Sequence, residues 1–172
     1  SRYRKGTLVF VHNTIVSTRT DRTTFFRLST NEESCDARNN VFYATLPGDT
    51  VSMLDAAGAL RLAGNWIKPG WRGTFGELQG RIEDAGGMVQ SEAPGFASEL
   101  NRNYRPAAGS ACVNRAVAAP LEIGFQYREH TGWEPRAADG APDIGAFEYR
   151  PRLRDKAPEP RVSTPRGRRE RR

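Results

Sequence analysis

Three nine-residue segments decide the fold: LVFVHNTIV (residues 8–16), SCDARNNVF (34–42) and LRLAGNWIK (60–68). Aligned on one asparagine each, they place three equivalent residues 26 positions apart: Asn13, Asn39 and Asn65. A repeat of about 20 to 50 residues is typical of a solenoid, in which each repeat winds one coil onto the next. A coil of this length has room for about three short strands and their turns. We therefore predict an all-β parallel solenoid.

Apolar or small residues alternate around each asparagine with the period of two that a strand requires. The positions expected to point into the coil are Val9, Val11, Ile15, Cys35, Ala37, Val41, Ala63 and Ile67. Asparagine suits the bend between two strands because it tolerates left-handed backbone, and its amide can bond the same amide one coil away. At a strand spacing of about 4.8 Å the three amides would form a ladder. The alternative is a β-sandwich in which the asparagine spacing is accidental.

Short motifs in these coils, HNTIV (12–16) and RNNVFY (38–43), resemble those of bacterial right-handed parallel β-helix proteins, a superfamily that includes pectate-lyase-like enzymes. Three later segments resemble, in the same order, the closing module of such proteins, known as the choice-of-anchor Q domain: EAPGF (92–96), NYRPAAGSACVN (103–114) and PDIGAFEY (142–149). The resemblance implies a right-handed β-helix, a secreted or cell-surface location, and a polysaccharide or cell-envelope glycan as partner. The chain begins within about one strand of the first recognisable coil and shows no cap there, so we expect further coils of the same protein upstream of Ser1.

The closing module departs from its relatives at one place. Relatives usually read Ser-Pro and then Asp-Ala-Gly where this chain has Ser110-Ala111 and Asn114-Arg115-Ala116, so any role of that Asp is absent. Asp143-Ile144-Gly145 suits a tight turn, with the Asp side chain bonding nearby backbone and Gly at positive φ. Residues 146–149 then alternate as a final strand.

The chain divides into three parts by composition and pattern. We expect coils over residues 1–85 and a capping module over 86–149 that covers the last open rung, because a bare terminal rung invites aggregation. Residues 150–172 hold ten Arg and Lys against three Asp and Glu, are rich in Pro, and read as a disordered tail. The tail is either simply solvated or binds anionic glycans, the cell envelope or nucleic acid.

Partners are limited by charge and hydropathy. The formal charge of +6 belongs to the tail, and the rest of the chain is nearly neutral, which argues against nucleic acid as its partner. No run approaches the roughly 18 apolar residues of a membrane span.

The two cysteines, Cys35 and Cys112, fit no zinc pattern. They are two buried thiols, one disulfide or a reactive site. His12 and His130 lack a nucleophile or metal-ligand spacing and are expected at the surface.

Candidate substrate-binding residues lie in the segment WIKPGW. Lys68 could face an acidic sugar between Trp66 and Trp71, whose flat rings suit sugar stacking. The alternative is that these rings pack in the core or against the cap.

The acidic group Asn31, Glu32, Glu33 and Asp36 offers oxygen ligands suited to Ca²⁺, or forms a solvated turn. No transition-metal site or organic cofactor is predicted.

Two function classes remain. The first is a structural or polysaccharide-binding part of a secreted or cell-surface β-helix protein, without a complete active site of its own. The alternative is part of a lyase or glycoside hydrolase of acidic polysaccharide, in which the resemblance implies a Lys or Arg base and calcium.

Overall fold

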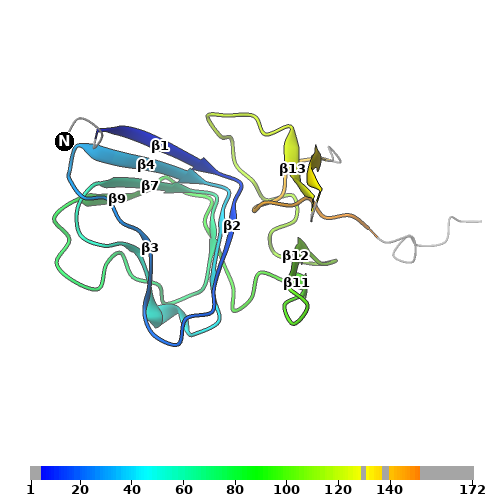
Figure 1. The fold of residues 1–172 in the computed structure, drawn as a ribbon, viewed down its shortest axis with the longest axis horizontal. Helices are drawn as coiled ribbons and strands as arrows, with labels where there is room; N and C mark the ends of the chain where they lie inside the picture. Colours follow the sequence, from blue (N-terminus) through cyan, green and yellow to red (C-terminus); the bar gives the residue numbers. More distant parts are fainter. Residues whose placement is uncertain (1–4, 129–130, 137–139, 152–172) are drawn as a thin grey trace, which may run out of the picture.

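The computed structural model describes residues 5–128, 131–136 and 140–151. They form an all-β structure whose first part is a parallel solenoid of about three turns (Figure 1). The predicted parallel β-helix is confirmed, and the β-sandwich alternative is wrong, because strands of successive coils pair in parallel.

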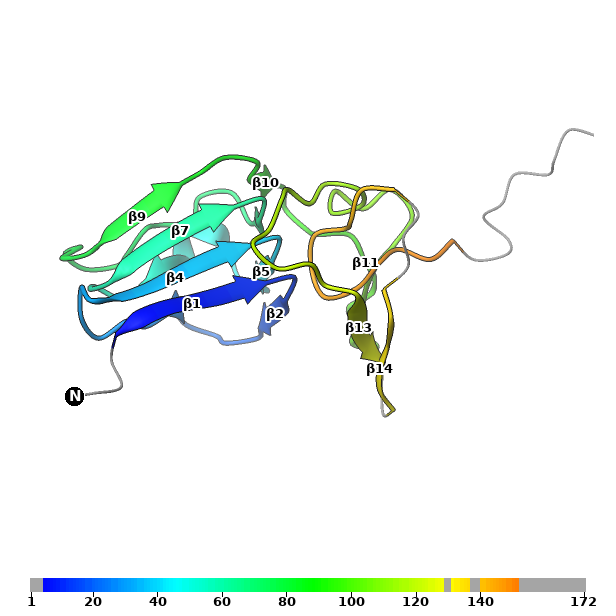
Figure 2. The same ribbon diagram turned by 90° about the horizontal axis from the view of Figure 1, so that it is seen from above.

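Three sheets form the sides of the solenoid. The first sheet contains, in order, β1 (Gly6–Val11), β4 (Glu33–Arg38), β7 (Ala59–Ala63) and β9 (Arg81–Asp84). The second contains β2 (Thr14–Ser17), β5 (Val41–Ala44), β8 (Trp66–Ile67) and β10 (Val89–Gln90). The third pairs β3 (Thr23–Phe26) with β6 (Val51–Leu54), which follows the 3-10 helix η1 (Gly48–Thr50). Figure 2 shows the strands of the first sheet lying side by side.

The asparagine ladder exists, but its middle member is Asn40 and not Asn39. The amide nitrogen Nδ2 of Asn13 donates to Oδ1 of Asn40 at 3.0 Å, and Nδ2 of Asn40 donates to Oδ1 of Asn65 at 2.9 Å. The backbone N–H groups of Asn13 and Asn40 donate to the same two oxygens. The coil spacings are therefore 27 and 25 residues, and the equal spacing of the sequence alignment was off by one in the middle coil.

The left-handed bend and the ladder lie on adjacent residues. The residue before each ladder asparagine has positive φ: His12 (53°), Asn39 (56°) and Gly64 (60°). Asparagine and glycine are the residues that adopt this conformation most readily. The bend turns the chain from the first sheet into the second, and the next residue then carries the amide that joins the coils.

The one-residue shift also changes which side chains face inward. Cys35 and Ala37 point into the coil as expected, but in β1 the inward residues are Leu8 and Phe10, their register partners, in place of the predicted Val9 and Val11. In the second sheet Ile15 and Ile67 face the core as predicted, but Val41 faces outward, where residues 112 and 144 cover it. In the first sheet the predicted Ala63 also faces outward. A slip of one residue in a strand moves a side chain to the opposite face.

The solenoid core is dominated by aromatic and aliphatic side chains. Phe42 is 1% exposed, stacks on Phe10 at a centroid distance of 6.5 Å and meets Phe26 edge-on at 5.5 Å. The other fully buried core residues include Met53, Leu54, Leu60, Leu62 and Ile67. Apolar burial of this kind is the main stabilising contribution to the coils.

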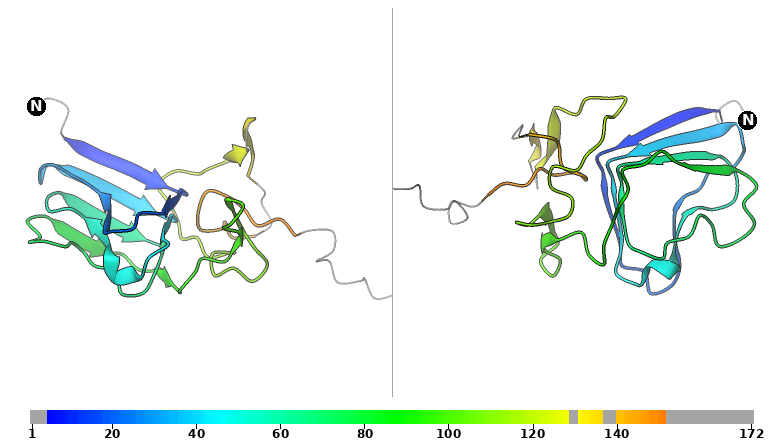
Figure 3. Two further views of the ribbon diagram at one scale, coloured as in Figure 1. Left: turned by 60° about the horizontal axis from the view of Figure 1, so that its bottom comes forward. Right: turned by 180° about the vertical axis from the view of Figure 1, so that it is seen from behind.

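A second part of the chain, here called the side module (residues 91–151), follows the coils. It contains two antiparallel strand pairs: β11 (Phe96–Ser98) with β12 (Asn103–Pro106), and β13 (Phe125–Arg128) with β14 (Gly132–Pro135). It lies beside the coils, on the outer face of the second sheet, and not over their end (Figure 3). The prediction of a lid on the last rung is therefore wrong. The side module instead buries three large side chains that face outward from the second sheet: Val41, Tyr43 and Trp66.

The predicted boundary at residue 85 also moves, because β10 pairs with β8 and extends the solenoid to Gln90. Gly145 has the predicted positive φ, 102°, and the side chain of Asp143 bonds backbone, accepting the N–H groups of Asn114 at 2.7 Å and of Tyr149 at 2.5 Å. These partners lie outside the predicted tight turn, and the segment forms a bend. Residues 146–149, predicted as a final strand, contain none. Residues 152–172, most of the predicted tail, lie outside the described part, as does His130. Among the described residues no helix is long and apolar enough to cross a membrane.

Candidate functional site

The predicted substrate-binding residues do not form an open surface. Trp66 is fully buried between the second sheet and the side module, and its indole N–H donates to Oγ of Ser91 at 2.8 Å. Lys68 is 8% exposed and donates to the carbonyl groups of Ala44 and Leu46, both at 3.0 Å. Trp71 packs half-buried against the core. The packing alternative describes Trp66 and Lys68, which are buried and closed to a sugar, whereas sugar binding by the half-buried Trp71 stays a prediction.

The acidic group of the first turn is dispersed among separate partners. Glu32 forms an ion pair with Lys5 at 3.1 Å, and Glu33 accepts the backbone N–H of Ser29. Asn31 joins the turns of two coils by accepting the N–H of Gly58 at 2.8 Å. Within the described residues no three His, Cys, Asp or Glu side chains lie close enough to hold a metal ion, and calcium binding stays a prediction.

Both cysteines are free and buried, as the first of the three alternatives has it. Cys35 belongs to the solenoid core and Cys112 to the interface with the side module. Burial raises the pKa of each thiol to about 12, so neither is ionised at neutral pH. The structure gives them a packing role.

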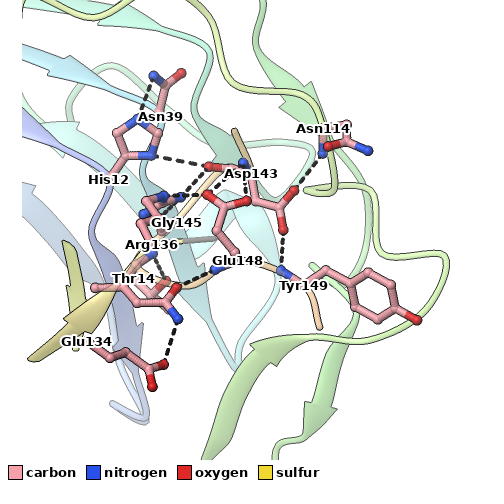
Figure 4. Close-up of polar contacts among 12 residues, drawn as sticks. His12, Thr14, Asn39, Asn114, Glu134, Arg136, Asp143, Gly145, Glu148 and Tyr149 are labelled. Carbon is pink, nitrogen blue, oxygen red and sulfur yellow. Dashed lines mark hydrogen bonds and ion pairs between the residues drawn. The ribbon is translucent and has the colours of Figure 1, made fainter. Parts of the chain in front are cut away.

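His12 lies at the junction of the solenoid and the side module, which corrects its prediction as a surface residue. Nδ2 of Asn39 donates to Nε2 of His12 at 3.2 Å, so the ring hydrogen lies on Nδ1, which donates to the carbonyl of Asp143 at 3.2 Å (Figure 4). Burial, with Arg136 nearby, lowers the pKa of His12 to about 4. The neutral ring is therefore a structural link between two distant parts of the chain.

A buried ion pair supports the same junction. The side chains of Arg136 and Glu148 are 6% and 1% exposed and are directly bonded to each other. Arg136 also donates to the carbonyl groups of Asp143 and Gly145, and the carboxylate of Glu148 accepts the N–H of Asp143 at 3.2 Å (Figure 4). Burial raises the pKa of Glu148. This network holds the 140–151 segment against the coils.

The outer face of the first sheet is the open, chemically varied surface of the solenoid. Its outward residues fall into rows that cross the coils. One row has Thr7, Ser34, Ala59 and Arg81, and the next has Val9, Asp36, Arg61 and Glu83. We call these two rows, with Arg38 of the following row, the charged face. Figure 2 views the first sheet from its outer side.

An open groove of about 200 Å³ lies on the charged face. Its floor is made of small side chains, and the hydroxyl groups of Thr7 and Ser34 are bonded at 2.6 Å. Arg61, Glu83 and Arg81 are exposed at its last two coils. The floor offers hydroxyl groups and the walls offer charges, which is a combination that hydrogen-bonds polar ligands.

The charges of this face differ in how they are engaged. Arg38 makes a two-point contact with Asp36 at 2.7 and 2.8 Å and donates to the carbonyl of Ala118 in the side module. Arg61 is paired with Glu83 at 3.2 Å in an exposed ion pair. Arg81 has no ion pair with another residue in the described part of the chain. Its exposed guanidinium can therefore meet an incoming anion without first breaking such a pair.

Three residues of the groove were not predicted from the sequence: Arg61, Arg81 and Glu83. They occupy outward positions at the same level of the coil as Ser34 and Asp36, and only the register of the first sheet brings them together. An alignment of the coils on the correct ladder asparagines would have placed Arg61 beside Asp36.

The sequence matches no protein-family model, and no curated protein or solved structure is significantly similar to it.

Proposed function

We propose that the chain is a polysaccharide-binding part of a secreted or cell-surface β-helix protein of the pectate-lyase-like superfamily, with a choice-of-anchor Q type module. The ligand is a segment of acidic polysaccharide lying along the charged face. The observation that carries the proposal is the groove on this face, which is lined by the hydroxyl groups of Thr7 and Ser34 and by Arg81, an exposed arginine that has no ion pair among the described residues.

The chemistry of the groove fits a chain of sugars that bear carboxylates. The guanidinium of Arg81 can bond a carboxylate through two parallel N–H groups. Thr7, Ser34 and the carboxylate of Glu83 can bond sugar hydroxyl groups, as donors or acceptors. The rows cross the coils at the strand spacing of about 4.8 Å. An elongated ligand lying along them meets the hydroxyl groups of Thr7 and Ser34 on the first two coils and the charged side chains on the last two.

Titration calorimetry with uronate hexamers, such as oligogalacturonate and oligoalginate, tests the proposal. Arg81→Ala is expected to weaken binding roughly fivefold, as for the loss of an exposed charge-assisted contact. Glu83→Gln is expected to strengthen it by a smaller factor, because it removes a like charge and releases Arg61. Arg72→Ala is the matched control, since Arg72 is exposed on another side of the solenoid.

Three outcomes would overturn the proposal. Binding of no uronate oligomer would remove it, and equal affinities of Arg81→Ala and the parent protein would move the site elsewhere. If the absorbance of the unsaturated product rises in the same mixtures after Ca²⁺ is added, the chain is part of a lyase and not a binding protein alone.

A further inference from the structure

The hairpin of β13 and β14 has inverted polarity. Of its register pairs, Gln126 and Glu134 face the interior of the side module, whereas Phe125, Tyr127 and Trp133 face solvent. The exposed fractions of these aromatic residues are 54%, 52% and 68%, and that of Gln126 is 4%. A strand pair folded for stability alone places its aromatic residues inward and its polar residues outward. The arrangement needs another explanation.

Hydrogen bonds fix the hairpin in this orientation. Nε2 of Gln126 donates to Oε1 of Glu134 at 2.7 Å, and Oε1 of Gln126 accepts the N–H of Glu148 at 2.8 Å. Arg105 adds an ion pair to Glu134 at 3.0 Å. The bond from Gln126, with help from Arg105, lowers the pKa of Glu134 and keeps it ionised. Turning the hairpin over would break all of these contacts, so the aromatic face is held open to solvent.

The aromatic face is ordered as well as exposed. The rings of Phe125 and Trp133 meet edge to face at 4.6 Å, and Tyr127 lies opposite Trp133 in the register. Pro135 completes the face opposite Phe125. None of these four outward positions carries a charge. Figure 2 shows the hairpin standing out from the side module, away from the coils.

We propose that this aromatic face is a second binding site, which takes the apolar face of a neutral saccharide. Sugar rings present a face of polarised C–H groups, and the electron-rich faces of aromatic rings attract them. A stable protein interface needs about 20 to 30 residues on each side, and four outward residues on a short hairpin fall far below that. The uncharged surface separates this ligand from the acidic one proposed for the charged face.

The test is a fluorescence titration of the whole chain with cellohexaose, xylohexaose and mannohexaose. Trp133 is the exposed indole, whereas Trp66 is buried and Trp71 half-buried, so a ligand on the hairpin changes the Trp133 emission. Trp133→Ala is expected to weaken binding of the recognised hexamer roughly tenfold or more, as for an aromatic hot spot. Because this variant lacks the reporter indole, its affinity is measured by calorimetry. Trp133→Phe keeps an aromatic ring and is expected to retain part of the affinity.

Two controls separate this site from the charged face. Leu100→Ala removes another exposed apolar side chain, 93% exposed, and is expected to bind normally. Arg81→Ala is expected to leave neutral-sugar affinity unchanged, and added salt should have little effect on it. An unaltered melting temperature of Trp133→Ala shows that the fold is intact.

The proposal fails if none of the hexamers binds, or if Trp133→Ala binds as well as the parent chain. It also fails if sedimentation shows a concentration-dependent dimer that Trp133→Ala abolishes, because the face is then a self-association surface.

Discussion

The solenoid and the side module are stabilised in different ways. The coils bury a continuous apolar core, and each core residue has counterparts at the same level of the neighbouring coils. The side module buries few apolar groups, chiefly Cys112 and Ile144, and relies on buried polar residues that include Arg136, Asp143 and Glu148. A repeated architecture is stabilised by packing that any coil can supply, whereas a module that occurs once depends on specific polar pairs.

The largest loss of stability is expected from truncating a side chain in the apolar core of the solenoid. Phe42→Ala removes a ring that contacts other rings on three sides, and we expect the free energy of unfolding to fall by about 3 to 5 kcal/mol. Denaturant unfolding followed by circular dichroism measures the change, with Leu100→Ala as an exposed control. A loss below about 1 kcal/mol would show that the rings are not in a packed core.

A second variant tests how far the side module depends on its buried ion pair. Arg136→Met keeps the length of the side chain but leaves Glu148 buried without its cation, and we expect a loss of up to about 3 kcal/mol. The loss is limited because the pKa of Glu148 is already raised and the group can take up a proton. Hydrogen exchange should show faster exchange in residues 91–151 while β4 and β5 stay protected. Equal deprotection of both regions would show that they unfold as one unit.

A third effect concerns the link between the two regions and appears only as the pH is lowered. The pKa of His12 is about 4 in the folded chain and near 6.5 when unfolded, so the unfolded chain binds more protons between these values. Stability from this group is present above about pH 6.5 and is lost as the pH falls toward 4. Glu148, with its raised pKa, contributes a slope of the opposite sign above its usual pKa of 4.5.

His12→Asn isolates the contribution of the histidine, because Asn tolerates the left-handed φ of this position and does not titrate. We expect the melting temperature of the variant to fall less than that of the parent chain between pH 6.5 and 4, while the Glu148 contribution is shared by both. Parallel pH profiles of the two proteins would contradict the assigned role of His12.

The solenoid could be predicted from the sequence because its physical cause is repeated along the chain. Asn13 and Asn65 were placed correctly, and so was the parallel stacking. The choice of Asn39 over Asn40 failed because the middle coil has two adjacent asparagines, and the sequence does not say which one takes the bend. The error in register carried over to Val9, Val11 and Val41.

The position of the side module could not be predicted, because it depends on contacts that occur once. The amide of Asn39 bonds both the N–H and the carbonyl of Val117, each at 2.8 Å, across 78 residues of sequence. Trp66 looked like a sugar-stacking residue because its partner surface was unknown. The aromatic face of the hairpin could have been noticed from the alternation in FQYR (125–128), but not its orientation, which Gln126 and Glu134 determine.

The register of the corner between the first and second sheets tests the account most directly. Nuclear Overhauser spectra of the labelled chain should connect the amide proton of Val41 with Asn13 and that of Trp66 with Asn40, because these N–H groups donate to the carbonyl groups of Asn13 and Asn40, both at 2.8 Å. These contacts define parallel coils stacked on the ladder of Asn13, Asn40 and Asn65. Contacts that instead connect Trp66 with Asn39, or an antiparallel pattern between β2 and β5, would contradict the solenoid described here.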